Sequence, residues 1–234
     1  MKKLKLSRSK IELFMDCPKC FYLDVVKNIK RPSGFPFTLN NAIDTLLKKE
    51  FDEHRKNGTQ HPIQTAFGID AKPANHPQIA QWQNSLKGGV SYYDDKHDCT
   101  FFGGIDDLWV APDGTYHVVD YKVTAKQTIV TSLPDWADAY KRQVEIYQWL
   151  LRKNGLKVSD TAYFVYCTGN SSRAYFHNTL HFHSHLISYT GNDDWIECVI
   201  EQMFETMAGS YAQVASNSRC EHCSFINLMR ALKY

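Results

Sequence analysis

The chain has 234 residues, of which 43% are hydrophobic and 22% are charged, and its formal net charge is +2 at pH 7. These values are typical of one soluble domain with a sizeable core, and so small a net charge does not by itself require a nucleic-acid partner. No apolar run is long enough to span a membrane, and the basic start MKKLKLSRSK has no apolar stretch after it, so we expect neither a membrane segment nor a signal peptide.

The N-terminal segment predicts helices. Ser7 or Ser9 can cap a first helix that continues through Phe14, and residues 21–26 fit a second short helix. After a loop at 31–36, a longer helix is predicted by the period of its apolar positions. That helix covers Thr38 to Arg55, and its apolar stripe is Leu39, Ile43, Leu46, Leu47 and Phe51. Asp44 projects from the same region.

Residues 57–89 form a long connection that is rich in Gly, Pro, Asn and Gln. One short helical stretch is predicted around residues 78–86. A connection of this length is usually functional or mobile, so it either covers a substrate or packs on the core. Residues 90–93 then predict a strand.

Residues 101–123 predict a β-hairpin. Its turn, Pro112-Asp113-Gly114, fits a three-residue loop, because Pro presets φ and Gly takes the left-handed position that closes the loop. With this loop, Ala111 faces Thr115, and continuing the pairing places Asp106 opposite Asp120.

Lys122 lies two residues after Asp120 and therefore on the same face, opposite Gly104, which leaves space beside the charges. Asp107 points to the other face. Facing carboxylates repel, so Asp106 and Asp120 either lie at a solvated tip or hold a divalent cation between them. Mg²⁺ is commonly held by one or two carboxylates, and a nearby Lys then orients water or stabilises charge on a phosphate. The cation is the interpretation that we favour.

The C-terminal half predicts further helices and strands. Ser132 to Asp135 resembles a capping box that opens a helix to Lys153, with Gln143 and Tyr147 on one face of that helix. Packing alone explains Tyr147 well and Gln143 poorly. The remaining elements are a strand at 161–167, one or two strands within 175–189, and a helix from 193 to 214 that is capped by Asn192. A polar strand face explains His181, His183 and His185 better than a metal site does.

Four of the seven cysteines form two Cys-x-x-Cys pairs, Cys17 with Cys20 and Cys220 with Cys223. An odd number of cysteines and this spacing favour a reducing cytoplasm and metal ligation over disulfides. The pairs can provide four thiolates to one centre if the fold brings the chain ends together, and both Zn²⁺ and a [4Fe–4S] cluster accept four thiolates. The other three, Cys99, Cys167 and Cys198, are expected to be buried apolar residues.

Three motifs in order resemble those of the PD-(D/E)xK nuclease superfamily, and the RecB-type branch is the most similar. They are Gly-Gly-Ile-Asp106, Val-Val-Asp120-Tyr-Lys122, and Gln143-Val-Glu-Ile-Tyr147. The resemblance covers residues 6–147 together with the cysteines. It implies an α/β fold with a restriction-endonuclease-like core, in which helices flank a central mixed sheet. We therefore expect one domain over 1–234, with an insertion at 57–89 and termini joined by the cysteine centre.

The resemblance also implies a function, which is hydrolysis of DNA by an exonuclease that acts on single strands and uses Mg²⁺ or Mn²⁺. Asp106 and Asp120 would hold the metal and Lys122 would act on the water or the phosphate, while Gln143 and Tyr147 would position the strand. A His of the family is replaced here by Asp44, a candidate third ligand. Related nucleases hold an iron–sulfur cluster through one N-terminal and three C-terminal cysteines. The pairs in this chain depart from that pattern, yet the resemblance favours the cluster over zinc.

Two other functions remain open. The chain could be a non-catalytic DNA-binding or assembly subunit with a degraded site and a structural metal. With either function, the chain could have protein partners in a repair, recombination or CRISPR-adaptation complex. It could also be a zinc-stapled domain whose carboxylates bind a small phosphate ligand. The near-neutral charge and the Asp at position 44 are consistent with the first of these.

Overall fold

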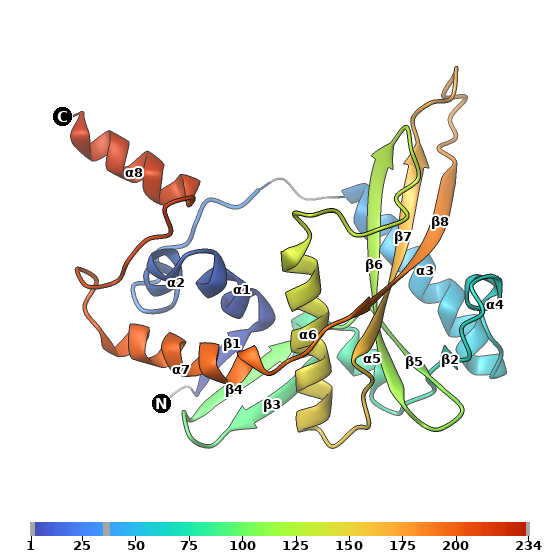
Figure 1. Cartoon of the computed structure of the whole chain (residues 1–234), viewed down its shortest axis with the longest axis horizontal. Coiled ribbons are helices and arrows are strands. Elements are labelled where there is room, and N and C mark those ends of the chain that lie inside the picture. Colours follow the sequence, from blue (N-terminus) through green and yellow to red (C-terminus); the bar gives the residue numbers. More distant parts are fainter. Residues whose placement is uncertain (1–2, 35–37, 233–234) are drawn as a thin grey trace. The chain divides into compact units, whose positions relative to one another are not determined.

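The structure is a computed structural model that describes residues 3–34 and 38–232 (Figure 1). The described residues form two units. Within the described ranges, the first draws on residues 3–34, 93–101 and 194–232, and the second on residues 38–92 and 102–193. No helix in the described ranges is both long and apolar enough to cross a lipid bilayer.

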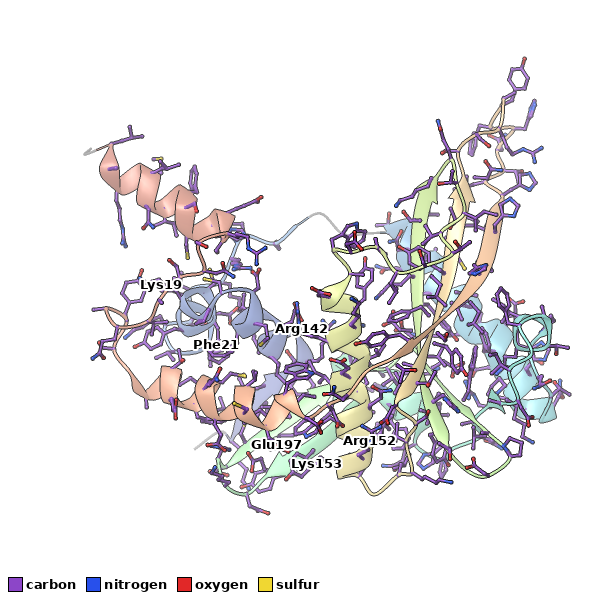
Figure 2. All side chains as sticks on the ribbon, viewed as in Figure 1. Lys19, Phe21, Arg142, Arg152, Lys153 and Glu197 are labelled. Atoms are coloured by element: carbon purple, nitrogen blue, oxygen red, sulfur yellow. The ribbon has the colours of Figure 1, made fainter. Side chains whose placement is uncertain are left out.

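The first unit is mainly helical. Its helices are α1 (Arg8–Asp16), α2 (Pro18–Val25), α7 (Trp195–Ala208) and α8 (Glu221–Ala231). A separate three-stranded sheet, whose residues are not all in this unit, takes the order β1 (Leu4–Ser7), β4 (Cys99–Gly103), β3 (Val90–Asp94). Helices α1 and α2 meet edge to face through Phe14 and Phe21, whose ring centroids are 5.3 Å apart, and Figure 2 labels Phe21 on α2. The first helix begins after Ser7, which is its N-cap residue, but the Ser7 side chain makes no capping hydrogen bond and lies 2.7 Å from the Ser9 hydroxyl instead.

Three features of the first unit differ from expectation. Helix α7 is capped by Asp194 rather than Asn192, and it ends at Ala208 because Gly209 takes an extended conformation. Strand β1 and helix α8 were not predicted. Cys198 is exposed rather than buried, whereas Cys99 and Cys167 are buried as expected.

A five-stranded mixed sheet forms the centre of the second unit. Its order is β2 (Lys72–Pro73), β5 (Asp107–Val110), β6 (Tyr116–Lys126), β7 (Thr161–Asn170), β8 (Phe182–Thr190). Strands β6 and β7 are parallel, and the other neighbouring pairs are antiparallel. The α/β class with a mixed sheet flanked by helices is therefore confirmed.

The hairpin of β5 and β6 has the predicted register. Val110 pairs with Tyr116 and Asp107 with Val119. The amide of Gly114 donates to the carbonyl of Ala111 at 3.0 Å, and Gly114 has a φ of +79°, so the loop closes as the Pro-Asp-Gly sequence predicts. The hairpin is shorter than expected, because β4 ends at Gly103 in the other sheet and β5 begins only at Asp107.

Helices cover both faces of the five-stranded sheet. Helix α3 (Thr38–Asn57) packs on one face, where Phe51 stacks on Tyr121 with ring centroids 5.6 Å apart. Helix α6 (Asp138–Lys153) lies on the other face, and its Arg152, labelled in Figure 2, donates to Asp160 at 2.6 Å. Because successive residues of a strand point to opposite faces, Asp120 and Lys122 lie on the α6 side of β6.

The long connection at 57–89 packs on the core. It contains α4 (Pro62–Ala66), β2, α5 (Ile79–Trp82) and a 3₁₀ turn at Ser85–Lys87. Ile63 and Ala71 are buried in the same cluster as Phe51. The helix expected at 78–86 is therefore split into α5 and the 3₁₀ turn.

Other boundaries were also misjudged. The Ser132 capping box is not used, because α6 begins at Asp138 with Ala137 as its N-cap. Within α3, Leu39 and Leu46 are about half exposed and do not belong to the buried stripe. The region 175–189 has one strand, β8, which starts at Phe182. The loop expected at 31–36 lies partly outside the described residues.

Candidate functional site

The candidate site forms where β5 stops and β6 continues. Strand β5 begins at Asp107, so beyond Asp120 the edge of β6 no longer has β5 as a partner. Asp106 takes over part of that role with its side chain, because its Oδ2 accepts a hydrogen bond from the backbone amide of Tyr121 at 2.9 Å. The register that places Asp106 beside Asp120 thus brings the two carboxylates together at the point where the edge of β6 is left without β5.

Asp120 and Lys122 are held by Gln143 of α6. The Nε2 of Gln143 donates to Asp120 Oδ1 at 2.7 Å, and Lys122 Nζ donates to Gln143 Oε1 at 3.2 Å. Lys122 Nζ also lies 2.7 Å from Asp120 Oδ2. Tyr147, one turn further along α6, lies 3.5 Å from Gln143 Nε2 through its hydroxyl. The expected shared face of Gln143 and Tyr147 is confirmed, and Gln143 contacts both charged residues of β6.

A cavity of about 490 Å³ opens beside these groups. Its lining includes Asp106 and Lys122 from the sheet, Asp44 and Asn40 from α3, and Tyr140 from α6. The ammonium of Lys122 lies 4.1 Å from the centre of the Tyr140 ring, a cation–π contact that fixes the Lys122 side chain at the cavity wall. The cavity is open to a ligand that reaches both Asp106 and Lys122.

Lys48 is a residue of this site that sequence reasoning missed. It lies one turn after Asp44 on α3, and its Nζ is 2.9 Å from Asp44 Oδ2 and 3.7 Å from Asp106 Oδ1. The four-residue spacing from Asp44 was the available signal, because residues at that spacing share a helix face. Lys48 therefore places a positive charge between the two carboxylates.

The electrostatics of Asp106 are unfavourable without a cation. Burial and the Asp120 carboxylate raise the pKa of Asp106 to about 7, although the Lys48 ammonium opposes this. Asp120 Oδ2 is buried and accepts no hydrogen bond from the described residues; its partner there is the Lys122 ammonium. Mg²⁺ and Mn²⁺ prefer carboxylate oxygens as ligands, and the negative charge of these two carboxylates is only partly neutralised by the lysines. The donor set fits a hard divalent cation.

The three carboxylates are not gathered as tightly as a closed metal site requires. Among the described residues, one group of three or more His, Cys, Asp or Glu has all its potential metal-ligand atoms within 4.8 Å of one another, and that group consists of four cysteines. Asp44 is held by Lys48. For Asp44 to join Asp106 and Asp120 around one ion, Lys48 has to move away.

Two neighbouring residues have structural roles. Asp107 points away from the site, as predicted, and it is fully buried, where it accepts hydrogen bonds from Arg55 at 2.5 Å and from the Tyr121 hydroxyl at 3.0 Å. Gly104 does not leave space beside Lys122. A Cβ at Gly104 would lie 2.8 Å from the side chain of Ser85, so this glycine is required for close packing against the 3₁₀ turn.

The first unit contains the cysteine group. Cys17, Cys20, Cys220 and Cys223 are buried, and their Sγ atoms all lie within 4.8 Å of one another. The distance is 3.7 Å between Cys17 and Cys223, and 3.6 Å from Cys20 to each of Cys220 and Cys223. The two pairs, distant in sequence, do converge, and they are placed to hold one metal centre jointly.

The two pairs are built in the same way. Cys17 is the N-cap of α2 and Cys220 is the N-cap of α8, and in each pair the second cysteine follows in the first helical turn. Two helix N-termini therefore direct their partial positive charge at the thiolates. Arg31 adds a full positive charge, since its Nη2 lies 3.2 Å from Cys220 Sγ. This environment offsets the negative charge of a four-thiolate centre.

Comparison with known proteins identifies a family. The model of the PD-(D/E)XK nuclease superfamily matches residues 5–228, which is nearly the whole chain. A search of curated proteins finds no match.

Proposed function

The chain belongs to the PD-(D/E)XK nuclease superfamily, and from that premise we propose that it hydrolyses phosphodiester bonds of DNA at the carboxylate site, defined as Asp106, Asp120 and Lys122. One observation is the main support for this proposal. Gln143 holds the buried carboxylate of Asp120 and the ammonium of Lys122 together at the wall of a cavity that Asp106 also lines.

Each residue has a distinct role in this proposal. A divalent cation, Mg²⁺ or Mn²⁺, supplies a Lewis acid that polarises a phosphate and makes water more acidic. Asp106 and Asp120 would hold it. Lys122 is placed to orient the attacking water or to stabilise negative charge on the phosphate oxygens. Gln143 fixes Lys122, and Tyr147, which is 4% exposed, acts through Gln143.

Asp44 is the proposed third ligand, and its recruitment depends on Lys48. In the cation-free protein Lys48 neutralises both Asp44 and Asp106. A divalent cation carries more charge in a smaller volume than an ammonium, so it would displace Lys48 and leave Asp44 free to bind. Lys48 is then available to a phosphate oxygen at the rim of the cavity.

The experiment compares cleavage of labelled single- and double-stranded DNA with Mg²⁺, with Mn²⁺ and with chelator. We expect metal-dependent cleavage that prefers single strands and proceeds from an end, as an exonuclease does. Lys122→Ala should abolish it, whereas Lys56→Ala, at an exposed position of α3, should not. A preparation that is folded and loaded with metal yet cleaves neither substrate would refute the proposal.

The second candidate function is a non-catalytic DNA-binding or assembly subunit. The observation that favours it is the ion pair of Lys48 with Asp44, which leaves the carboxylates apart. Protein partners in a repair, recombination or CRISPR-adaptation complex are compatible with both functions. Calorimetry separates the two functions, because a degraded site binds no Mn²⁺, and Asp120→Asn would then leave the titration unchanged.

For the four cysteines we propose a structural metal centre. The resemblance to RecB-type nucleases favours a [4Fe–4S] cluster, but the sulfur spacing favours a single ion. A tetrahedral zinc with Zn–S bonds of about 2.3 Å separates its sulfurs by about 3.8 Å. The observed 3.6–3.7 Å is close to that value, whereas the thiolates of a cluster bind four different irons and lie further apart.

Colour and metal content decide between the two centres. Anaerobically purified protein should be colourless and hold about one zinc per chain, apart from any metal at the carboxylate site. A brown protein with broad visible absorption would establish the cluster instead. None of the seven cysteines, all of which lie in the described ranges, forms a disulfide, which supports the cytoplasmic location that we propose.

A further inference from the structure

The connection between β7 and β8 is an ordered hairpin tip. The amide of Asn170 donates to the carbonyl of His181 at 2.8 Å, and the amide of Thr179 donates to the carbonyl of Phe176 at 2.9 Å. Between these last two residues, His177 and Asn178 have φ values of +45° and +57°. Two successive positive φ angles closed by such a bond define a type I′ turn, the tight turn that best matches strand twist. The tip therefore continues the β7–β8 hairpin beyond the ends of both strands and closes it with a defined turn (Figure 1).

The tip presents two large aromatic side chains to solvent. Tyr175 is 74% exposed and Phe176 is 68% exposed, and they precede the turn directly. The ring centroids of Tyr175 and His177 are 5.5 Å apart, which adds a third ring. Adjacent exposed rings on a defined turn contribute nothing to the core of the protein, so this pair is available to a partner.

The charge of this region identifies the kind of partner. From Thr161 to Asn192 the chain contains no Asp or Glu, and it contains Arg173 and the four histidines 177, 181, 183 and 185. Lys126 of β6 is in register with Asn170 at the end of β7. A surface with basic and neutral groups but no acidic ones attracts a polyanion. Exposed aromatic rings can stack on the flat faces of nucleobases.

The sheet connects this tip to the carboxylate site. Strands β6 and β7 are parallel, with Lys122 opposite Tyr166 and Lys126 opposite Asn170. The end of β7 therefore lies four residues past Lys122 along the strand direction, or about 13 Å, and the tip continues beyond it. A nucleic-acid strand whose phosphate lies at Lys122 can follow β6 and β7 towards Tyr175 and Phe176.

We propose that Tyr175 and Phe176 form a stacking platform for bases of single-stranded nucleic acid several nucleotides away from the scissile phosphate. The strand must be single, because base faces are covered by their neighbours within a duplex. The proposal rests on the proposed function for the path of the strand, while binding at the tip requires neither metal nor catalysis.

The test measures binding in chelator, where no cleavage occurs. The double variant Tyr175→Ala, Phe176→Ala is compared with wild type by fluorescence anisotropy on an oligothymidine and on an abasic strand of equal length and charge. Wild type should prefer the strand that has bases, and the variant should lose that preference, weakening oligothymidine binding by roughly 5- to 150-fold per stacked base. Phe225→Ala, at a residue of α8 that is 64% exposed, should bind as wild type does.

Several outcomes would overturn the platform. These are equal wild-type affinity for both strands, an equal loss of affinity for both strands in the double variant, or binding of wild type to anionic lipid vesicles but to neither oligonucleotide. The double variant Tyr175→Phe, Phe176→Trp keeps the rings and should restore the preference for bases. Hydrolysis of a short chromogenic phosphodiester with Mn²⁺ tests the carboxylate site alone, so failure of the nuclease proposal is seen separately.

Discussion

The pKa of Asp106 predicts that replacing this carboxylate stabilises the cation-free protein. Burial and the charge of Asp120 raise that pKa to about 7. A change from an ordinary value of about 4 corresponds to roughly 4 kcal/mol against the ionised form. The Asp106 side chain is still 23% exposed, and solvent screening reduces the effect to about 2 kcal/mol. Asp106→Asn keeps an oxygen that can accept from the Tyr121 amide and removes the charge.

The direction of the pH dependence follows from the raised pKa. Because the folded pKa of Asp106 exceeds the unfolded one, the protonated side chain is favoured by folding, and this stability is fully present below about pH 4. It is lost as the pH rises towards about 7. The advantage of Asp106→Asn should therefore grow over this interval and level off above it.

Urea unfolding in chelator between pH 5 and pH 8 measures this advantage, with Glu53→Gln, at an exposed position of α3, as the control. Adding Mg²⁺ at pH 8 should raise the unfolding free energy of wild type and leave Asp106→Asn nearly unchanged, since a ligand stabilises the state that binds it. If Asp106→Asn shows the same pH dependence as wild type in chelator, the electrostatic account of this site is wrong.

Three further predictions concern Asp107, Lys122 and the cysteines. Asp107→Ala should cost about 3–5 kcal/mol in urea unfolding, because it leaves the Arg55 guanidinium buried without its partner, and the double change Asp107→Leu, Arg55→Met should recover most of that loss. Lys122→Ala should lower the cleavage rate far more than Mn²⁺ affinity in titrations, and Lys122→Arg should rescue little, since a planar fork does not replace a compact ammonium; equal losses of rate and affinity would assign Lys122 to the metal instead. Serine at any one of the four clustered cysteines should lower the melting temperature of the metal-loaded protein, because metal binding energy is folding energy, whereas Cys198→Ser, at an exposed position, should leave it unchanged.

The sequence alone determined the features that depend on a few neighbouring residues. The Pro112-Asp113-Gly114 turn set the register of the hairpin, because loop length and turn type fix which residues face each other. Helical spacing placed Gln143 and Tyr147 on one face, and strand alternation directed Asp107 away from Asp120. The central residues of the candidate site follow from these local rules.

Only the tertiary structure decided which distant elements meet. Nothing near β6 in the sequence shows that β7 pairs with it in parallel, or that Lys48 of α3 reaches Asp106. Cys17 and Cys220 meet because the N-termini of α2 and α8 come together in one unit, and the spacing within each pair does not contain that information. The physical reason is that turn geometry and side-chain period are set by interactions within one or two turns of chain. Pairings across many residues are selected by the burial of the whole core, to which each residue contributes only a small part.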